Sequence, residues 1–193
     1  MILGLTGGMG CGKSAAANLF AQQGFEVMDS DAVVRTSILT DPAVIDSVRE
    51  HFGDGILASG GAIDRRKLAE RVFADKPSLE WLEGVVHPRL FEHWRRTFSA
   101  QTGQSWVVEV PLLFEKSLQN WFDFTICVAC DPTVQLARLE QRGVSPSLAR
   151  LRIAQQLPLT QKIKLADFVL LNDGSFDFLR QQVEALVKSI RSL

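Results

Sequence analysis

Four glycines stand close together near the start of the chain, immediately before a lysine and a serine. Residues 7–14 read GGMGCGKS and fit the pattern G-x-x-x-x-G-K-[ST]. Glycine adopts backbone conformations closed to other residues, so successive N–H groups of such a loop can point inward around phosphate oxygens. Lys13 is long enough to reach the β- and γ-phosphates of a nucleotide, and the Ser14 hydroxyl is suited to ligate Mg²⁺. The segment therefore predicts a nucleotide site of the P-loop kind.

Two carboxylates follow the next apolar run of the chain. Asp29 and Asp31 come directly after Val27 and Met28, one predicted helix beyond the glycine-rich loop. A kinase needs a group beside its phosphate loop that orients the acceptor hydroxyl and takes its proton during transfer. We expect Asp31 to have this role, as much by positioning as by proton removal, because an ordinary aspartate has a pKa of about 4. Asp29 either supports it or caps the following helix.

Arginines gather late in the chain, around a short turn that contains Gly143. The cluster comprises Arg138, Arg142, Arg150 and Arg152. On two helices joined by a turn, such residues can form a flap that closes over bound phosphates, excludes water and supplies positive charge. Taken singly, each arginine is more typical of a solvated helix surface than of such a flap. Arg142 is the strongest candidate because it lies closest to the turn.

Two further acids stand at the ends of apolar runs. Glu109 is a candidate for outer-shell contact with Mg²⁺, or equally a strand residue that faces a polar cleft. Asp131 precedes Pro132, so capping of a helix explains it at least as well as metal binding. The chain has neither the N-K-x-D segment that reads guanine nor a strand that ends in Asp-Glu, which argues against GTPases and motor ATPases.

Three cysteines invite a chemical interpretation. Cys127 and Cys130 form one C-x-x-C pair inside an apolar run, which favours two buried cysteines over a metal or redox site. Cys11 lies in the glycine-rich loop at the start of a predicted helix, where the pKa of a thiol can fall. Its oxidation would block the phosphate site.

These residues require a frame of strands and helices. Short apolar runs at residues 1–6, 25–28, 106–110, 124–130 and 168–171 predict buried strands, and amphipathic segments lie between them. This alternation is typical of an α/β protein with a parallel sheet covered on both faces. We therefore predict a three-layer P-loop NTPase fold, with the phosphate loop between the first strand and the first helix.

The segment between the second and third predicted strands is mostly helical. Asp64 and Ser78 are candidate N-caps there, and the second of these helices is expected to end near Pro88. We predict one domain, whose core comprises about 1–30, 105–137 and 165–193. An acceptor-binding insertion takes up about 31–104, and a lid takes up about 138–164.

Composition narrows the class of protein. The 193 residues carry a formal net charge of −1, which argues against a general nucleic-acid-binding surface. No apolar run approaches a membrane span, and residues 1–6 are too short for a signal peptide. Three cysteines are too few for a secreted disulfide framework, so we expect a cytoplasmic protein that is a monomer or weak homo-oligomer.

A set of motifs in fixed order resembles the dephospho-CoA kinase family. The motifs are residues 6–14, Asp29-Ser30-Asp31 with Arg35, residues 64–68, Val72-Phe73, His87-Pro88, residues 111–115, Gln141-Arg142, Gln155-Gln156, Lys162, Ala166-Asp167 and Asn172-Asp173-Gly174. The P-loop is common to many families, whereas the combination with HP, PLL and the late Asn-x-Gly is specific. Cys11 departs from the serine or threonine that is frequent in the family.

The resemblance implies ATP-dependent phosphorylation of the ribose 3′-hydroxyl of dephospho-CoA, with Mg²⁺, in the last step of coenzyme A synthesis. It implies catalytic roles for Asp31, Lys13 and Arg142, and a metal role for Ser14. For ATP binding it implies Gly8, Met9, Gly10, Cys11, Gly12, Lys13, Ser14, Ala15, Arg138, Arg142 and, at the adenine end, Asn172. For the acceptor it implies Asp31, Arg65, Phe73, His87, Pro88, Pro111 and Leu112.

Several readings stay open beside these roles. On its own, His87-Pro88 is a helix kink with a buried imidazole, and Pro111 belongs to an apolar loop after a strand. Phe73, with Trp81 and Phe91, is favoured as a core residue over a stacking residue. At the level of function, the alternatives are another P-loop small-molecule kinase and a nucleotide-dependent switch without an acceptor.

Overall fold

The computed structural model describes residues 1–192, in which five strands alternate with helices. The strands are β1 (Ile2–Gly7), β2 (Glu26–Asp29), β3 (Trp106–Glu109), β4 (Phe124–Ala129) and β5 (Phe168–Leu171). They form one parallel sheet in the order β2-β3-β1-β4-β5. The predicted parallel α/β sheet is confirmed, and each strand lies within one residue of its expected bounds.

The chain divides into two compact units. One, which we call the sheet unit, comprises Met1–Asp29 and the chain from Gly103 onward. The other, the helical unit, comprises Ser30–Thr102. The covalent links between them follow β2 and precede β3.

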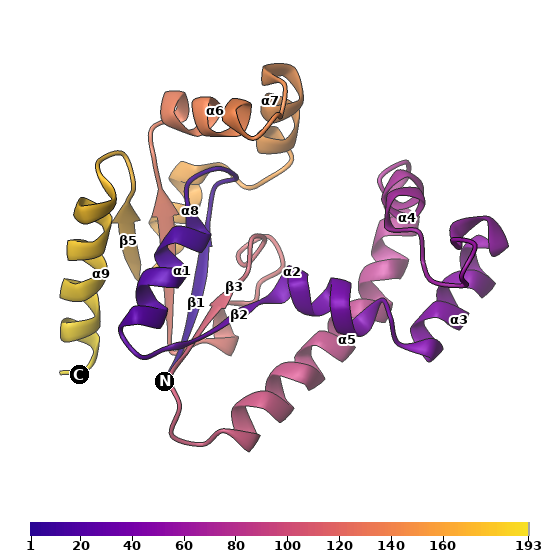
Figure 1. The fold of residues 1–193 in the computed structure, drawn as a ribbon, viewed down its shortest axis with the longest axis horizontal. Coiled ribbons are helices and arrows are strands. Elements are labelled where there is room, and N and C mark those ends of the chain that lie inside the picture. The colour runs from indigo at the N-terminus through magenta and orange to yellow at the C-terminus, as the bar shows by residue number, and fades with distance from the viewer. Residues whose placement is uncertain (193) are drawn as a thin grey trace. The chain divides into compact units, whose positions relative to one another are not determined.

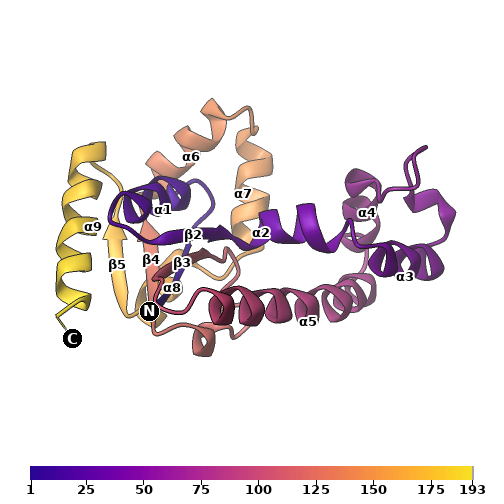
Figure 2. The same cartoon turned by 60° about the horizontal axis from the view of Figure 1, so that its bottom comes forward.

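Residues of β1 alternate between two differently covered faces of the sheet. Leu3 and Leu5 point into a core that α1 (Lys13–Gln22) and α9 (Phe176–Ile190) build over one face (Figures 1 and 2). Gly4 faces the other side, where a side chain at this position would overlap with Phe122 and Leu113. That side also carries η3 (Gln119–Trp121) and α8 (Leu159–Leu165), which contacts β1 and β4. The period of two in a strand thus gives each face its own cover.

Two more helices of the sheet unit begin at capping side chains, the first of them predicted from Asp131. In α6 (Pro132–Gln141) the Asp131 carboxylate accepts hydrogen bonds from the Thr133 backbone and hydroxyl, so Asp131 is an N-cap. These bonds, that of the Thr133 hydroxyl first, lower the pKa of Asp131. Ser145 caps α7 (Pro146–Ala154) in the same way. Figure 1 draws both helices at the end of the sheet where β1 leads into α1.

The helical unit consists of short helices and one long helix. They are α2 (Ser30–Val33), the π-helical turn η1 (Val34–Ile38), α3 (Pro42–Phe52), the 3₁₀ turn η2 (Asp54–Ile56), α4 (Arg65–Val72) and α5 (Lys76–Ala100). Asp64 caps α4 as predicted, with its carboxylate 3.0 Å from the Arg66 nitrogen. Figure 2 shows α5 as one continuous helix, on which α4 packs. None of the helices in residues 1–192 has the length and apolar character needed to cross a membrane.

The expectation that Ser78 caps a helix ending near Pro88 is wrong on both counts. α5 begins after Asp75, which caps it by accepting from Ser78, and it continues through Pro88 to Ala100. Val86, Leu90 and Trp94 recur every four residues on its buried face, so packing stabilises the helix on both sides of the proline. Because proline has no N–H, the carbonyl of an exposed glycine four residues earlier lacks the backbone hydrogen bond that it would otherwise accept.

Candidate active site

The glycine-rich loop joins β1 to α1 and permits approaches that no side chain would allow. Gly7 has φ 145°, and a Cβ there would lie 2.2 Å from the Val128 carbonyl oxygen. Gly12 has φ 96°, and a Cβ there would lie 2.1 Å from Nδ2 of Asn172. Both positions therefore require glycine, which leaves the backbone N–H groups of the loop accessible to an anion.

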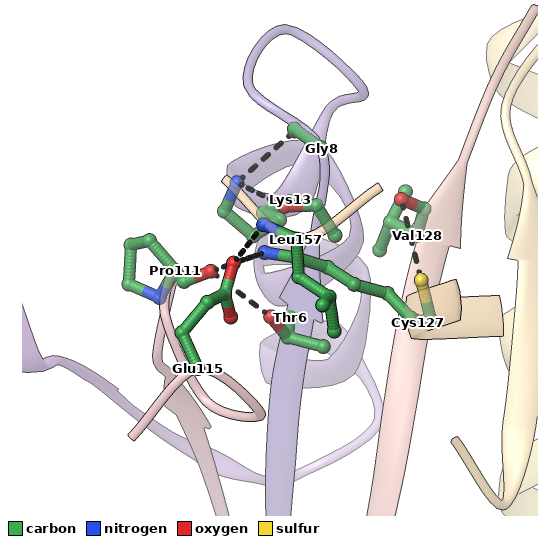
Figure 3. Close-up of polar contacts among 10 residues, drawn as sticks. Thr6, Gly8, Lys13, Pro111, Glu115, Cys127, Val128 and Leu157 are labelled. Carbon is green, nitrogen blue, oxygen red and sulfur yellow. Dashed lines mark hydrogen bonds and ion pairs between the residues drawn. The ribbon is translucent and has the colours of Figure 1, made fainter. Parts of the chain in front are cut away.

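Lys13 is the first residue of α1 and its side chain bends back over the loop. Its Nζ lies 3.2 Å from the carbonyl oxygens of both Gly7 and Gly8 (Figure 3). The ammonium group therefore lies at the N-terminal end of a helix, where the peptide dipoles also favour negative charge. This combination suits an anion such as phosphate.

Ser14 lies beside a carboxylate at the carboxyl end of β3. Its hydroxyl donates to Oε2 of Glu109 at 3.2 Å, and Glu109 is aligned with Asp29 of the neighbouring strand. Hydroxyl and carboxylate oxygens are the donors that Mg²⁺ prefers, so this group fits a magnesium ion with water between metal and carboxylate. Within residues 1–192 no three His, Cys, Asp or Glu side chains gather in a metal-binding group.

Two buried amide side chains hold the loop from other elements. Gln135 of α6 donates to the Met9 carbonyl at 2.6 Å, and Asn172, just after β5, donates to the Cys11 carbonyl at 2.8 Å. The family resemblance implies Asn172 at the ATP site, whereas none of the motifs includes Gln135. The available signal was a polar residue four positions before Leu139, on the buried face of its helix.

The structure distinguishes the two arginines expected to cover ATP. Nη1 of Arg138 is buried, has no hydrogen-bond partner in the described part of the chain, and lies 4.0 Å from the Cβ position of Gly12. Arg142 is exposed at the C-terminal end of α6. A buried guanidinium N–H beside the phosphate loop is suited to bind an anion.

The three cysteines are buried, and their thiols have different environments. The Cys130 thiol donates to Sγ of Cys11 at 3.3 Å, and this bond, with smaller contributions from Lys13 and Gly8, lowers the pKa of Cys11 to about 7. The same bond and burial raise the pKa of Cys130. Burial raises the pKa of Cys127 to about 12. The interpretation of Cys127 and Cys130 as buried cysteines is confirmed, although Cys130 pairs with Cys11.

A buried ion pair holds the loop that follows β3. The Lys162 side chain is fully buried, and its Nζ lies 2.8 Å from both Oε1 of Glu115 and the Pro111 carbonyl. Figure 3 shows Thr6 and Leu157 in the same network, where they donate to Pro111 and Glu115 respectively. The network ties the Pro111–Leu112 backbone to β1 and α8.

The helical unit contains a cavity of about 590 Å³. Asp31, Arg35, Arg65, Arg66 and Phe73 line it together with aliphatic side chains. Its charged lining suits an anionic ligand, and its apolar lining suits a ligand with an extended hydrocarbon or ring portion. The interpretation of Phe73 as a core residue is wrong, because its side chain is 72% exposed at this cavity. It follows the C-terminal end of α4, beyond the last buried residue of that helix.

The other aromatic and histidine candidates of the helical unit lie on α5. His87 is half-buried and stacks on Phe91 with ring centroids 5.8 Å apart. Trp81 is half-buried and stacks on His51 at 3.8 Å. Neither His87 nor Pro88 is among the residues that line the cavity around Asp31.

Comparisons with known proteins agree on one family. The family model for dephospho-CoA kinase matches residues 1–177. A dephospho-CoA kinase from Thermosynechococcus vestitus is 38% identical over 184 residues, which cover 94% of this chain and 91% of the relative. The crystal structure of TT1252 from Thermus thermophilus matches with a TM-score of 0.87 and 32% identity, over 98% and 97% of the two chains. Dephospho-CoA kinase from Campylobacter jejuni matches with a TM-score of 0.73 and 26% identity, over 98% and 96%.

Proposed function

The chain belongs to the dephospho-CoA kinase family. From this premise we propose which residues bind ATP, Mg²⁺ and the acceptor during phosphoryl transfer. The family uses ATP to phosphorylate dephospho-CoA in the final step of coenzyme A biosynthesis. The proposed acceptor atom is the ribose 3′-hydroxyl. The observation that carries the proposal is the loop of residues 8–15, whose lysine and helix terminus form a phosphate site.

The proposed ATP site uses the backbone of Gly8, Met9, Gly10, Cys11 and Gly12, followed by Lys13, Ser14 and Ala15 at the start of α1. Arg138 would bind a phosphate oxygen through its buried Nη1, and exposed Arg142 would join it when the lid of about 138–164 closes. Asn172 is proposed to contact the adenine end of ATP, and its amide also holds the loop by donating to the Cys11 carbonyl. Preorganised donors of this kind stabilise the charge that develops on the transferred group.

The proposed Mg²⁺ site consists of the Ser14 hydroxyl, with Glu109 and Asp29 reaching the ion through water. The metal would neutralise charge on the β- and γ-phosphates. Glu109 already accepts from the Ser14 hydroxyl, so it orients the oxygen that ligates the metal.

The main proposed acceptor contacts lie in the helical unit, with Asp31 as the group that orients the hydroxyl and accepts its proton. Arg65 would bind the diphosphate of dephospho-CoA, and Phe73 would contact an apolar part of the substrate. This assignment is supported by the shared cavity, which combines three arginines with Asp31 and Phe73. We also propose acceptor contacts for His87 and Pro88 of α5 in this unit and, in the sheet unit, for Pro111 and Leu112 after β3.

A panel of acceptors tests the reaction as a whole. ADP release would be measured with ATP and Mg²⁺ in the presence of dephospho-CoA, nucleosides, nucleotides, shikimate and sugars. We expect turnover with dephospho-CoA and with none of the other acceptors. ³¹P NMR of the product should show the new phosphate on the ribose 3′-oxygen. Turnover of a different acceptor without dephospho-CoA turnover would favour another small-molecule kinase. Nucleotide binding without transfer to any acceptor would favour a switch.

Glu109→Gln is expected to raise the Mg²⁺ concentration for half-maximal activity by about tenfold. The glutamine amide oxygen can still accept a hydrogen bond from the Ser14 hydroxyl, but it lacks the negative charge that favours the metal ion. The measurement is a Mg²⁺ titration at saturating ATP and dephospho-CoA. Glu26→Gln is the matched control, since Glu26 is an exposed residue at the other end of the neighbouring strand. An unchanged Mg²⁺ requirement in Glu109→Gln would make Glu109 a strand residue facing a polar cleft and nothing more.

A further inference from the structure

Two cysteines that are 119 positions apart in the chain meet beneath the phosphate loop. The thiol of Cys130, the residue that follows β4, lies 3.3 Å from Sγ of Cys11 and donates a hydrogen bond to it. Neither cysteine is in a disulfide. Cys11 is fully buried, and Cys130 is 6% exposed, so the pair reaches the surface on the Cys130 side.

Cys11 is built into the loop through its backbone as well as its thiol. Its N–H bonds the Gly8 carbonyl at 3.2 Å, and its own carbonyl accepts from Asn172 at 2.8 Å. Its Sγ packs directly under Gly8, where an added Cβ would come within 2.8 Å. A displacement of the Cys11 side chain therefore moves the N–H groups that are proposed to hold phosphate.

The surroundings favour the thiolate on Cys11 and the thiol on Cys130. The Cys130 hydrogen bond is the main cause that lowers the pKa of Cys11 to about 7, and the Lys13 ammonium assists it. Cys127, three residues before Cys130, has a pKa raised to about 12 by burial and donates to the Val128 carbonyl instead. The pair thus has one nucleophilic sulfur and one adjacent sulfur that can resolve its oxidation.

We propose that Cys11 and Cys130 are a redox-active dithiol, which a peroxide closes to a disulfide that disables the phosphate loop. The Cys11 thiolate attacks one peroxide oxygen, the O–O bond breaks, and hydroxide leaves and is protonated to water while Cys11 becomes a sulfenic acid. Cys130 sulfur then attacks Sγ of Cys11. The S–S bond forms as the S–O bond breaks, and the oxygen leaves with the Cys130 proton as a second water. Two thiols lose two electrons and the peroxide gains them.

Closure of the bond moves the loop. A disulfide brings the two sulfurs to about 2.05 Å, whereas they are now 3.3 Å apart. Since a misplacement of about 1 Å at a reacting site can cost about a hundredfold in rate, we expect the oxidised protein to lose about that factor in kinase activity. This loss rests on the proposed phosphate-binding role of the loop, whereas formation of the disulfide does not.

The test treats the full-length protein with excess hydrogen peroxide and follows the cross-link, ATP binding and activity together. Trypsin releases Cys11 in residues 1–13 and Cys130 in residues 117–138, a peptide that also contains Cys127. Mass spectrometry should find these peptides joined and lighter by two hydrogens. Cys127→Ala, the matched control, should form the same cross-link, which assigns it to Cys130. Dithiothreitol should separate the peptides and restore ATP binding and activity in parallel.

Cys130→Ala should keep its activity without peroxide, form no cross-link, and be inactivated about tenfold more slowly at pH 7, because Cys11 loses the bond that favours its thiolate. If that variant does not fold, Cys130→Ser serves, with the absent cross-link as its readout. The proposal is overturned if oxidised protein lacks the cross-link, or if Cys130→Ala is inactivated as fast as the unaltered chain. A cross-link that leaves ATP binding and activity intact would refute the claim that the disulfide disables the phosphate loop. A reduced protein that fails to bind ATP overturns the proposed function instead.

Discussion

Asp31→Asn is expected to lose between about a hundredfold and ten-thousandfold in kcat, the range in which a positioned general base contributes. The amide has the size of the carboxylate, but it cannot accept the proton of the acceptor hydroxyl. ATP affinity should stay unchanged, because the phosphate loop and Asn172 belong to the sheet unit, whereas Asp31 belongs to the helical unit. Steady-state kinetics with dephospho-CoA and calorimetric titration with ATP separate the two effects.

The control for this substitution is Asp46→Asn on α3. Asp46 is an exposed aspartate of the same unit. It pairs with Arg49 and is not among the residues that line the cavity around Asp31. Its kcat should match that of the unaltered enzyme. Equal turnover of Asp31→Asn and Asp46→Asn would refute the assignment of Asp31. Loss of ATP binding together with kcat would show that Asp31 acts through the nucleotide site.

Lys162→Met is expected to lower the free energy of unfolding by about 3 kcal/mol, the lower end of the cost of breaking a buried ion pair. The lower end applies because the Glu115 side chain keeps 16% of its exposure, whereas that of Lys162 keeps none. Methionine matches the volume of lysine but leaves the Glu115 carboxylate without its cation and the Pro111 carbonyl without its donor. Urea denaturation followed by circular dichroism measures the change.

Lys164→Met provides the matched control, since Lys164 is an exposed lysine of the same helix, and its change should stay within about 0.5 kcal/mol. A double variant, Lys162→Met with Glu115→Gln, should recover part of the stability because no uncompensated charge stays buried. If Lys162→Met is as stable as Lys164→Met, the ion pair does not stabilise the fold. Because the same lysine holds Pro111, which is proposed to contact the acceptor, the single variant should also raise KM for dephospho-CoA.

Local features of this chain were predictable because their causes are local. Glycines at positions that need positive φ, N-caps such as Asp64 and Asp131, and short apolar runs each depend on residues a few positions apart. The strands were therefore expected within a residue of where they lie, and the loop was expected to lead into a helix. Pro88 shows the limit, because burial of Leu90 and Trp94 on α5 outweighs a local rule against proline.

By itself, then, the sequence determined the parallel sheet and the family, and it predicted a nucleotide site with its lysine and serine. Only the tertiary structure decided which distant side chains support that site. Gln135 and the buried Nη1 of Arg138 reach the loop because β4 lies beside β1, so that α6 begins next to it. For the same reason the thiol that contacts Cys11 is that of Cys130, and not that of Cys127. Spacing along the chain describes neighbours on one strand, whereas the order of strands in a sheet decides which sulfur faces which loop.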